Sequence, residues 1–170
     1  MPCYFAIIGY QDNPIYEAEF PFPQLQSFPP ELKELNPFIL HASLDIIDDL
    51  QWQVNPITGM SNTSSGGFLR SRHNNSNENC YLGKIDHFYG FPITSYLSYG
   101  NIRFIMIHSN GTGNVNSTQI DDNQVKLFYQ EVHEMYIKAL MNPFYKVNDP
   151  ITSPVFDSRV RMLANKYLTK

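Results

Sequence analysis

The 170-residue chain has the length of one domain, and its 42% hydrophobic and 14% aromatic content indicates an ordered globular protein. A formal net charge of −4 argues against a nucleic-acid-binding protein, which would carry a basic face, and it gives no general attraction to anionic lipid. Cys3 and Cys80 are too few for a disulfide framework, so we expect free buried thiols in a reducing compartment.

The first residues predict a β-hairpin. Residues 4–8 are almost continuously apolar, which is typical of a strand covered on both faces. Residues 12–14 read Asp-Asn-Pro, a turn sequence, so residues 15–20 are expected to run back as a second strand. The apolar run is too short for a signal peptide, and no stretch approaches the roughly 20 apolar residues of a membrane span. We therefore expect neither export nor membrane insertion.

After a proline-rich connector over residues 21–30, a helix is predicted from about Glu31 to about Trp52. This helix carries two apolar stripes on roughly opposite sides. The stripe expected to face the protein's own core comprises Leu35, Ile39, Ala42, Ile46 and Leu50. The second stripe comprises Leu40, Leu44 and Ile47.

A second stripe must be covered by another layer of the same chain or by another protein, and the helix alone leaves both alternatives open. Asp45, Asp48 and Asp49 flank it, and polar flanks suit the rim of an interface better than a deep core. The candidate partner-binding residues are therefore Leu40, Leu44, Asp45, Ile47 and Asp48.

The second half of the chain predicts three strands between two flexible loops. Loops are expected at about 53–79, which is rich in Asn, Ser and Gly, and at about 109–120. Between them, residues 81–87, 91–98 and 102–108 read as strands joined by short glycine-bearing turns, which indicates antiparallel hairpins.

Two helices are predicted to complete the chain. The first has Asp121 as its N-cap and ends before Pro143. The second begins at Ser153-Pro154, with Val155, Val160, Leu163, Ala164 and Tyr167 expected to face inward. The order β-β-α-β-β-β-α-α is typical of an α+β fold, here a single domain over residues 1–170. The first and last strands are apolar on both faces, so we expect them side by side in the middle of the sheet.

Chemical motifs are weak throughout. His41 and Asp45, four residues apart on the first helix, would still need a third metal ligand from elsewhere. Gly111-x-Gly113 lacks the third glycine of a dinucleotide site, and neither a Walker-type lysine nor a nucleophile elbow occurs. We expect no catalytic residues, no metal and no cofactor.

Seven stretches carry a resemblance that spans nearly the whole chain. They are YFAIIG (4–9), DNPIYE (12–17), LNPFILHASLDIIDDL (35–50), YLGKIDHFYGF (81–91), IRFIMIH (102–108), FYQEVHEMYIKALMNPFY (128–145) and SPVFDSRVRMLA (153–164). In this order they resemble the sedlin family, small subunits of the TRAPP vesicle-tethering complex, and most closely its fungal members. The resemblance implies a longin-like fold, a five-stranded antiparallel sheet with one helix on one face and two on the other.

The resemblance also implies a function. The subunit is expected to be a non-catalytic adaptor that joins the core of the complex to larger peripheral subunits, with Asp45 in a partner contact. The assembly would serve ER-to-Golgi and intra-Golgi transport, autophagy and Rab GTPase activation, so a Rab GTPase would be an indirect partner. The expected location is cytoplasmic, peripherally associated with the cis-Golgi and the endoplasmic reticulum. The alternative, another longin-type trafficking adaptor or a SNARE-like regulatory module, would lack the stretches 141–145 and 153–160.

Overall fold

The computed structural model describes residues 3–20, 30–53, 80–88, 90–98, 100–108 and 121–168. The elements are β1 (Cys3–Ile8), β2 (Pro14–Phe20), α1 (Pro30–Gln53), β3 (Tyr81–Phe88), β4 (Phe91–Leu97), β5 (Arg103–His108), α2 (Asp122–Leu140) and α3 (Pro154–Leu168). This is the predicted order of strands and helices. The two predicted flexible loops, at about 53–79 and 109–120, lie outside the described residues.

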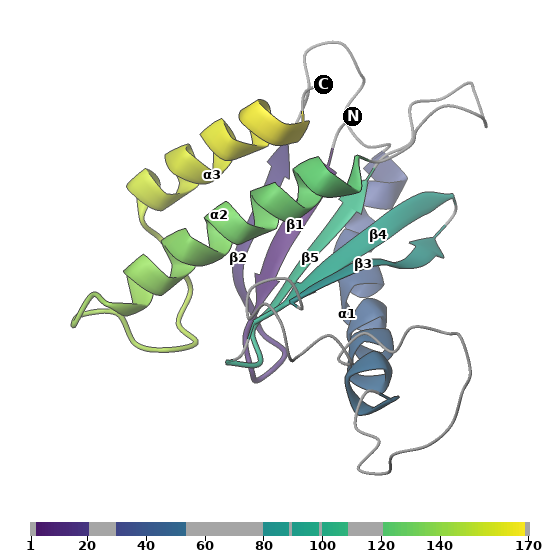
Figure 1. Ribbon diagram of the computed structural model, residues 1–170, viewed down its shortest axis with the longest axis horizontal. Coiled ribbons are helices and arrows are strands. Elements are labelled where there is room, and N and C mark those ends of the chain that lie inside the picture. Colours follow the sequence, from purple (N-terminus) through teal and green to yellow (C-terminus); the bar gives the residue numbers. More distant parts are fainter. Residues whose placement is uncertain are drawn as a thin grey trace.

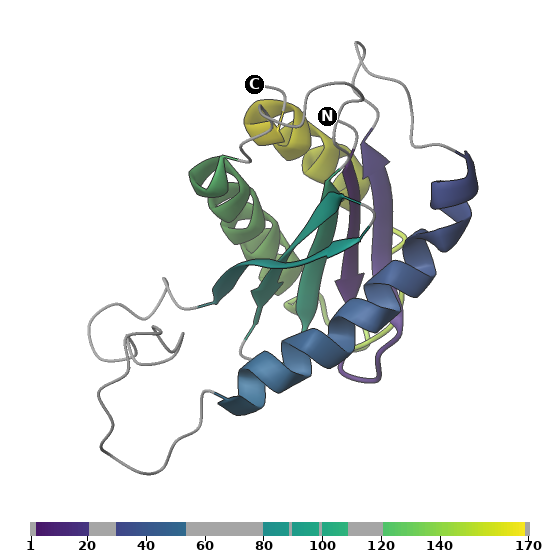
Figure 2. The same ribbon diagram turned by 90° about the vertical axis from the view of Figure 1, so that its right-hand side faces the viewer.

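The five strands form one antiparallel sheet in the order β2-β1-β5-β4-β3. Helix α1 covers one face, and α2 and α3 lie side by side on the other, which confirms the α+β, longin-like prediction (Figures 1 and 2). The first and last strands are neighbours at the centre, with Phe5 opposite Met106 and Ala6 opposite Ile105. Every residue of β5 is buried, as expected for a strand covered on both faces.

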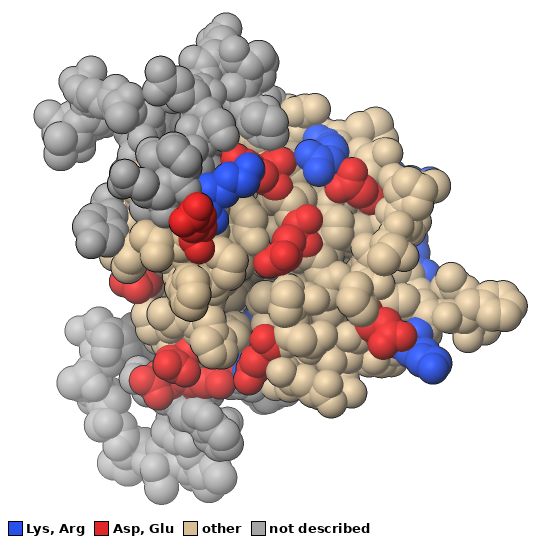
Figure 3. Space-filling view, turned by 180° about the vertical axis from the view of Figure 1, so that it is seen from behind, with Lys and Arg blue, Asp and Glu red and all other residues tan. Residues whose placement is uncertain are grey.

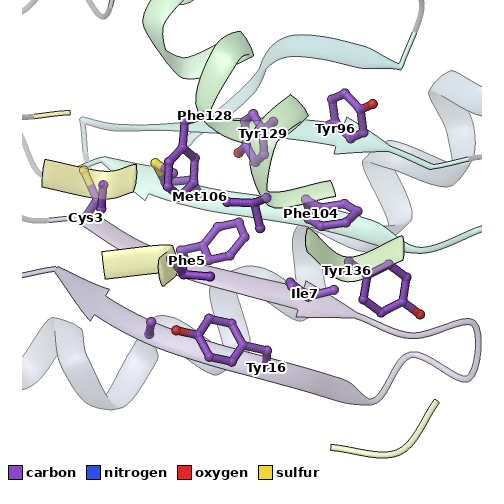
Figure 4. Close-up of a cluster of buried hydrophobic side chains, with 14 of the residues drawn as sticks. Cys3, Phe5, Ile7, Tyr16, Tyr96, Phe104, Met106, Phe128, Tyr129 and Tyr136 are labelled. Atoms are coloured by element: carbon purple, nitrogen blue, oxygen red, sulfur yellow. The ribbon is translucent and has the colours of Figure 1, made fainter. Parts of the chain in front are cut away.

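The alternation of side chains along the central strands creates two cores. Phe5, Phe104 and Met106 point toward α2 and α3, where aromatic side chains fill the space (Figure 4). In this core the rings of Phe5 and Phe128 pack edge to face with their centroids 5.3 Å apart, which is a favourable aromatic geometry. On the other face, Ala6 and Ile105 contact α1 in a core of aliphatic side chains.

Local signals in the sequence are mostly confirmed. The side chain of Asp121 accepts hydrogen bonds from the backbone N–H groups of Asn123 and Gln124, so it is the N-cap of α2. Cys3 and Cys80 are buried and form no disulfide, and burial raises the pKa of the Cys3 thiol to about 12. One inward-facing prediction on α3 is wrong, because Val155 is 60% exposed. The buried residues of α3 are Phe156, Val160 and Ala164, and this stripe leaves Val155 on the outer side of the first turn.

Candidate functional site

Helix α1 faces the sheet with the opposite stripe from the one predicted. Leu40, Leu44 and Ile47 are buried against the sheet, in contact with a cluster that includes Ile105 and Ile107. The prediction that these three residues bind a partner is therefore wrong. The physical reason is the charge on the other side of the helix: turning the predicted core stripe inward would desolvate the carboxylates of Asp45 and Asp49. Of the predicted core stripe, only Ile39 is buried, because it lies between the two stripes on the sheet side.

The other side of α1 forms an exposed surface, which we call the outer face of α1. It consists of Leu35, Phe38, Ala42, Asp45, Ile46 and Asp49, of which Ile46 is half-buried and the others are exposed. Phe38, which neither predicted stripe included, is 73% exposed. A helix with apolar residues on both sides was therefore correctly predicted, but its inner and outer sides were exchanged.

Charge on this side of the molecule is mainly negative. Figure 3 shows the surface from the α1 side, with acidic side chains spread among uncharged ones and gathered at one lower edge. Asp45 and Asp49 are exposed on α1. Apolar side chains bordered by solvated carboxylates have the composition of an interface with a polar rim. Asp45 is thus placed where a partner could reach it, and its role in partner binding stays a prediction.

Asp48, the remaining candidate, has a structural contact. Its Oδ1 accepts a hydrogen bond of 2.7 Å from Nη2 of Arg103, whose Nη1 donates another of 2.7 Å to Oδ1 of Asp12. The Arg103 side chain is only 5% exposed, so these two carboxylates compensate a buried charge. Arg103 belongs to the central strand β5, Asp12 to the β1–β2 turn and Asp48 to α1. The pair therefore fixes α1 to the sheet, while a partner contact at the 43% exposed Asp48 side chain stays a prediction.

These two ion pairs of Arg103, with Asp12 and Asp48, which we call the Arg103 clamp, were not predicted from the sequence. A signal was present, since Arg103 is a permanent cation inside the apolar run 102–108, and a buried guanidinium requires carboxylate partners. The sequence could not say which carboxylates those were. Asp12 and Asp48 lie 91 and 55 residues away from Arg103 in the chain.

His108, which is buried, and His133, which is half-buried, have internal partners. Nε2 of His108 lies 2.9 Å from the hydroxyl of Thr94, which is also 2.9 Å from the hydroxyl of Tyr129. Burial lowers the pKa of His108 to about 3, so this histidine is neutral at physiological pH. His133 lies between the hydroxyls of Tyr96 and Ser98, at 3.2 and 2.8 Å, and burial lowers its pKa as well.

Across the described ranges, no three His, Cys, Asp or Glu side chains are grouped so that they could hold a metal ion. The helices in the same ranges are all too short or too polar to cross a membrane.

Comparisons with known proteins match almost the full length of the chain. A family model described as Sedlin matches residues 7–166. The "Trafficking protein particle complex subunit 20" of Saccharomyces cerevisiae is 60% identical, with 100% of both chains covered. The "Transport protein particle 20 kDa subunit" of Schizosaccharomyces pombe is 40% identical over 99% of this chain and 100% of its own. A Drosophila melanogaster protein named "Probable trafficking protein particle complex subunit 2" is 32% identical over 97% and 96% of the two chains.

Proposed function

Because the chain belongs to the sedlin family, we propose that it is a non-catalytic adaptor subunit of the TRAPP vesicle-tethering complex. In this role it joins the core of the complex to larger peripheral subunits. It thereby supports ER-to-Golgi and intra-Golgi transport, Rab GTPase activation by the assembled complex, and autophagy, at the cytoplasmic side of the ER and the cis-Golgi. Relatives in three organisms that are named as subunits of this particle support the proposal.

The observation that carries the adaptor role is the outer face of α1. Burial of Leu40, Leu44 and Ile47 and the Arg103–Asp48 ion pair hold the helix against the sheet. A partner therefore meets a helix that is already ordered, and binding costs little conformational entropy. Phe38 supplies an exposed aromatic side chain, the type of residue that often dominates binding energy at interfaces.

Asp45 supplies the polar contribution to this surface. It is exposed, and it lies one helical turn after Ala42 and one turn before Asp49 on the same side. Charged residues at an interface rim determine partner choice and association rate more than raw affinity. We therefore place Asp45 at the contact with a peripheral subunit, beside apolar contacts made by Phe38 and Ile46.

Affinity purification of the tagged chain from cells tests the proposal. Asp45→Asn removes the charge and keeps the shape, whereas Asp45→Tyr adds bulk. If the contact is electrostatic, both variants lose a peripheral subunit while core subunits still co-purify; if it is steric, only the tyrosine variant does. Glu134→Tyr, which alters an exposed carboxylate on α2, is the matched control and should retain all subunits. The proposal fails if Asp45→Tyr co-purifies with every subunit in unchanged amounts, or if the wild-type chain co-purifies with none.

A further inference from the structure

A second surface lies on the other side of the sheet from α1. The last turns of α2, the connection 141–153 and the first turns of α3 enclose an open groove of about 400 Å³, which we call the α2–α3 groove. In Figure 1 the connection between these two helices is at the lower left, away from α1. The groove combines the stretches 141–145 and 153–160, which the alternative reading of the sequence would lack.

Apolar side chains border this groove without contributing to the core. Phe144 is 93% exposed, and Val155, across the groove on α3, is 60% exposed. The buried ring of Phe156 and the half-buried Ile151 lie deeper in the lining. An exposed apolar cluster of this kind is typical of an interaction site, because folding gains nothing from the exposed members.

The connection that presents Phe144 is held by hydrogen bonds at several points. The backbone N–H of Phe144 donates to Oδ1 of Asn142 at 3.1 Å, and the Tyr145 hydroxyl donates to the carbonyl of Asp149 at 2.6 Å. Further along, Nδ2 of Asn148 donates to Oδ1 of Asn13 at 2.6 Å, which ties the connection to the β1–β2 turn. The backbone that presents Phe144 is thus held before any partner arrives, which lowers the entropic cost of binding.

The same connection is anchored to the open edge of the sheet. The backbone N–H of Ile151 donates to the carbonyl of Ile15 in the edge strand β2 at 2.9 Å. This bond occupies an edge acceptor that could otherwise pair with another chain. A partner at this end of the molecule therefore meets the α2–α3 groove, because the connection covers the beginning of the edge strand β2.

The charge of the groove is opposite to that of the whole chain. Its lining includes Lys138 and Arg159 but no Asp or Glu, although the chain carries a net charge of −4. Within the described residues, neither cation has a carboxylate within 4.0 Å. The nearby carboxylate of Asp157 is engaged by Arg161 at 2.9 Å and by the Tyr16 hydroxyl at 2.8 Å. Two unpaired cations beside an apolar groove favour a ligand that carries both a large apolar group and carboxylates.

We propose that the α2–α3 groove binds an acidic protein segment through one large apolar side chain flanked by Asp or Glu. The apolar side chain packs between Phe144 and Phe156, and the carboxylates pair with Lys138 and Arg159. The groove is concave, which favours a protein side chain that enters it. A lipid surface would instead favour an apolar surface that protrudes from the protein. The proposal concerns a different surface from the outer face of α1 and adds a second docking site to the molecule.

The test is site-specific photo-crosslinking in the full-length chain, expressed in cells with its natural partners. A benzoylphenylalanine in place of Val155 reports what occupies the groove, and mass spectrometry identifies the crosslinked segment. We expect a segment of another protein in which the crosslinked position has Asp or Glu within three residues. Three results would overturn the proposal: a crosslinked segment without carboxylates, whether from another protein or from a second copy of this chain; a lipid adduct; or no intermolecular crosslink.

Variants separate the groove from a general effect on folding. Lys138→Glu with Arg159→Glu, and separately Phe144→Ala, should each lower the crosslink yield at least tenfold while the melting temperature changes by only a few degrees, because all three side chains are exposed. Lys84→Glu on β3 and Met162→Ala on α3 are the matched controls and should leave the yield unchanged. Equal yields from the groove variants and the controls would overturn the proposal. Co-purification of TRAPP subunits in the same samples reports on the proposed function independently.

Discussion

The two faces of the sheet are filled with different chemistry. Beneath α1, the buried cluster is aliphatic, and the helix is attached at its edge by the Arg103 clamp. Beneath α2 and α3, the cluster is rich in aromatic rings and includes hydrogen-bonded polar groups such as Thr94, Tyr129 and His108.

The difference shows how one sheet can provide rigid surfaces on its opposite sides. A single helix over an aliphatic core exposes a full face to partners, and the ion pair prevents it from sliding on a surface that offers few directional contacts. Two helices over an aromatic core cover each other, and the exposed apolar residues Phe144 and Val155 lie at the connection between them.

The largest effect is expected from introducing a carboxylate on the inner side of α1 rather than on its outer face. Leu44→Asp places an unpaired carboxylate in the aliphatic core, and we expect a loss of several kcal/mol, enough to unfold a domain of this size. Ala42→Asp, two residues away on the outer face, should cost less than about 1 kcal/mol, mainly in helix propensity. Urea unfolding of both variants measures the difference. Similar losses in the two variants would show that the outer face is also buried.

Acid should weaken the two sides of the sheet unequally. The pKa of His108 is about 3 in the folded protein, compared with 6.5 when solvated, so below pH 6.5 the unfolded chain binds the additional proton. Stability is therefore lost as the pH falls, by about 2 kcal/mol between pH 7 and pH 5. His133 acts in the same direction, because its pKa is also lowered.

Urea unfolding at the two pH values measures this loss, and hydrogen exchange localises it. His108→Gln should remove most of the loss, whereas His41→Gln, on the exposed side of α1, should retain it. Amides of α2 and β5 should lose protection at pH 5 before those of α1. If the amides of α1 lost protection first, the acid-sensitive groups would not be His108 and His133 on the α2 and α3 side of the sheet.

The Arg103 clamp should contribute less to the free energy of unfolding than the buried side chains of α1. Asp48→Asn leaves Arg103 with Asp12 as its charged partner, and because the Asp48 side chain is 43% exposed, we expect a loss of only about 1 kcal/mol. Asp49→Asn, on the neighbouring exposed carboxylate, should change the free energy of unfolding by less than about 0.5 kcal/mol. Chemical denaturation distinguishes the two values. Identical unfolding curves would mean that Arg103 does not hold α1 in place.

The sequence was sufficient to predict the elements and the centre of the sheet. Strands β1 and β5 are almost continuously apolar because both of their faces are covered, and this pattern can be read directly along the chain. The two stripes of α1 were equally visible, but periodicity alone does not say which one meets the sheet. That choice depends on the polar residues beside each stripe, and the carboxylates of Asp45 and Asp49 keep the predicted core stripe on the solvent side.

Features made by distant residues could not be predicted. The Arg103 clamp joins residues 12, 48 and 103, and the α2–α3 groove requires a helix end, a connection and the first turns of another helix. The exposure of Val155 follows from the packing of Phe156 rather than from the spacing of apolar residues in α3. Packing of this kind depends on the three-dimensional arrangement, whereas helix and strand patterns are local.

Phe38→Asp tests most directly whether the inner side of α1 holds the fold while its outer face binds partners. Unfolding and affinity purification should be measured on the same preparation. Since Phe38 is 73% exposed, we expect a melting temperature within a few degrees of the wild type, together with at least a tenfold loss of a co-purifying subunit. A melting temperature as low as that of Leu44→Asp, or an unchanged set of co-purifying subunits, would contradict the claim.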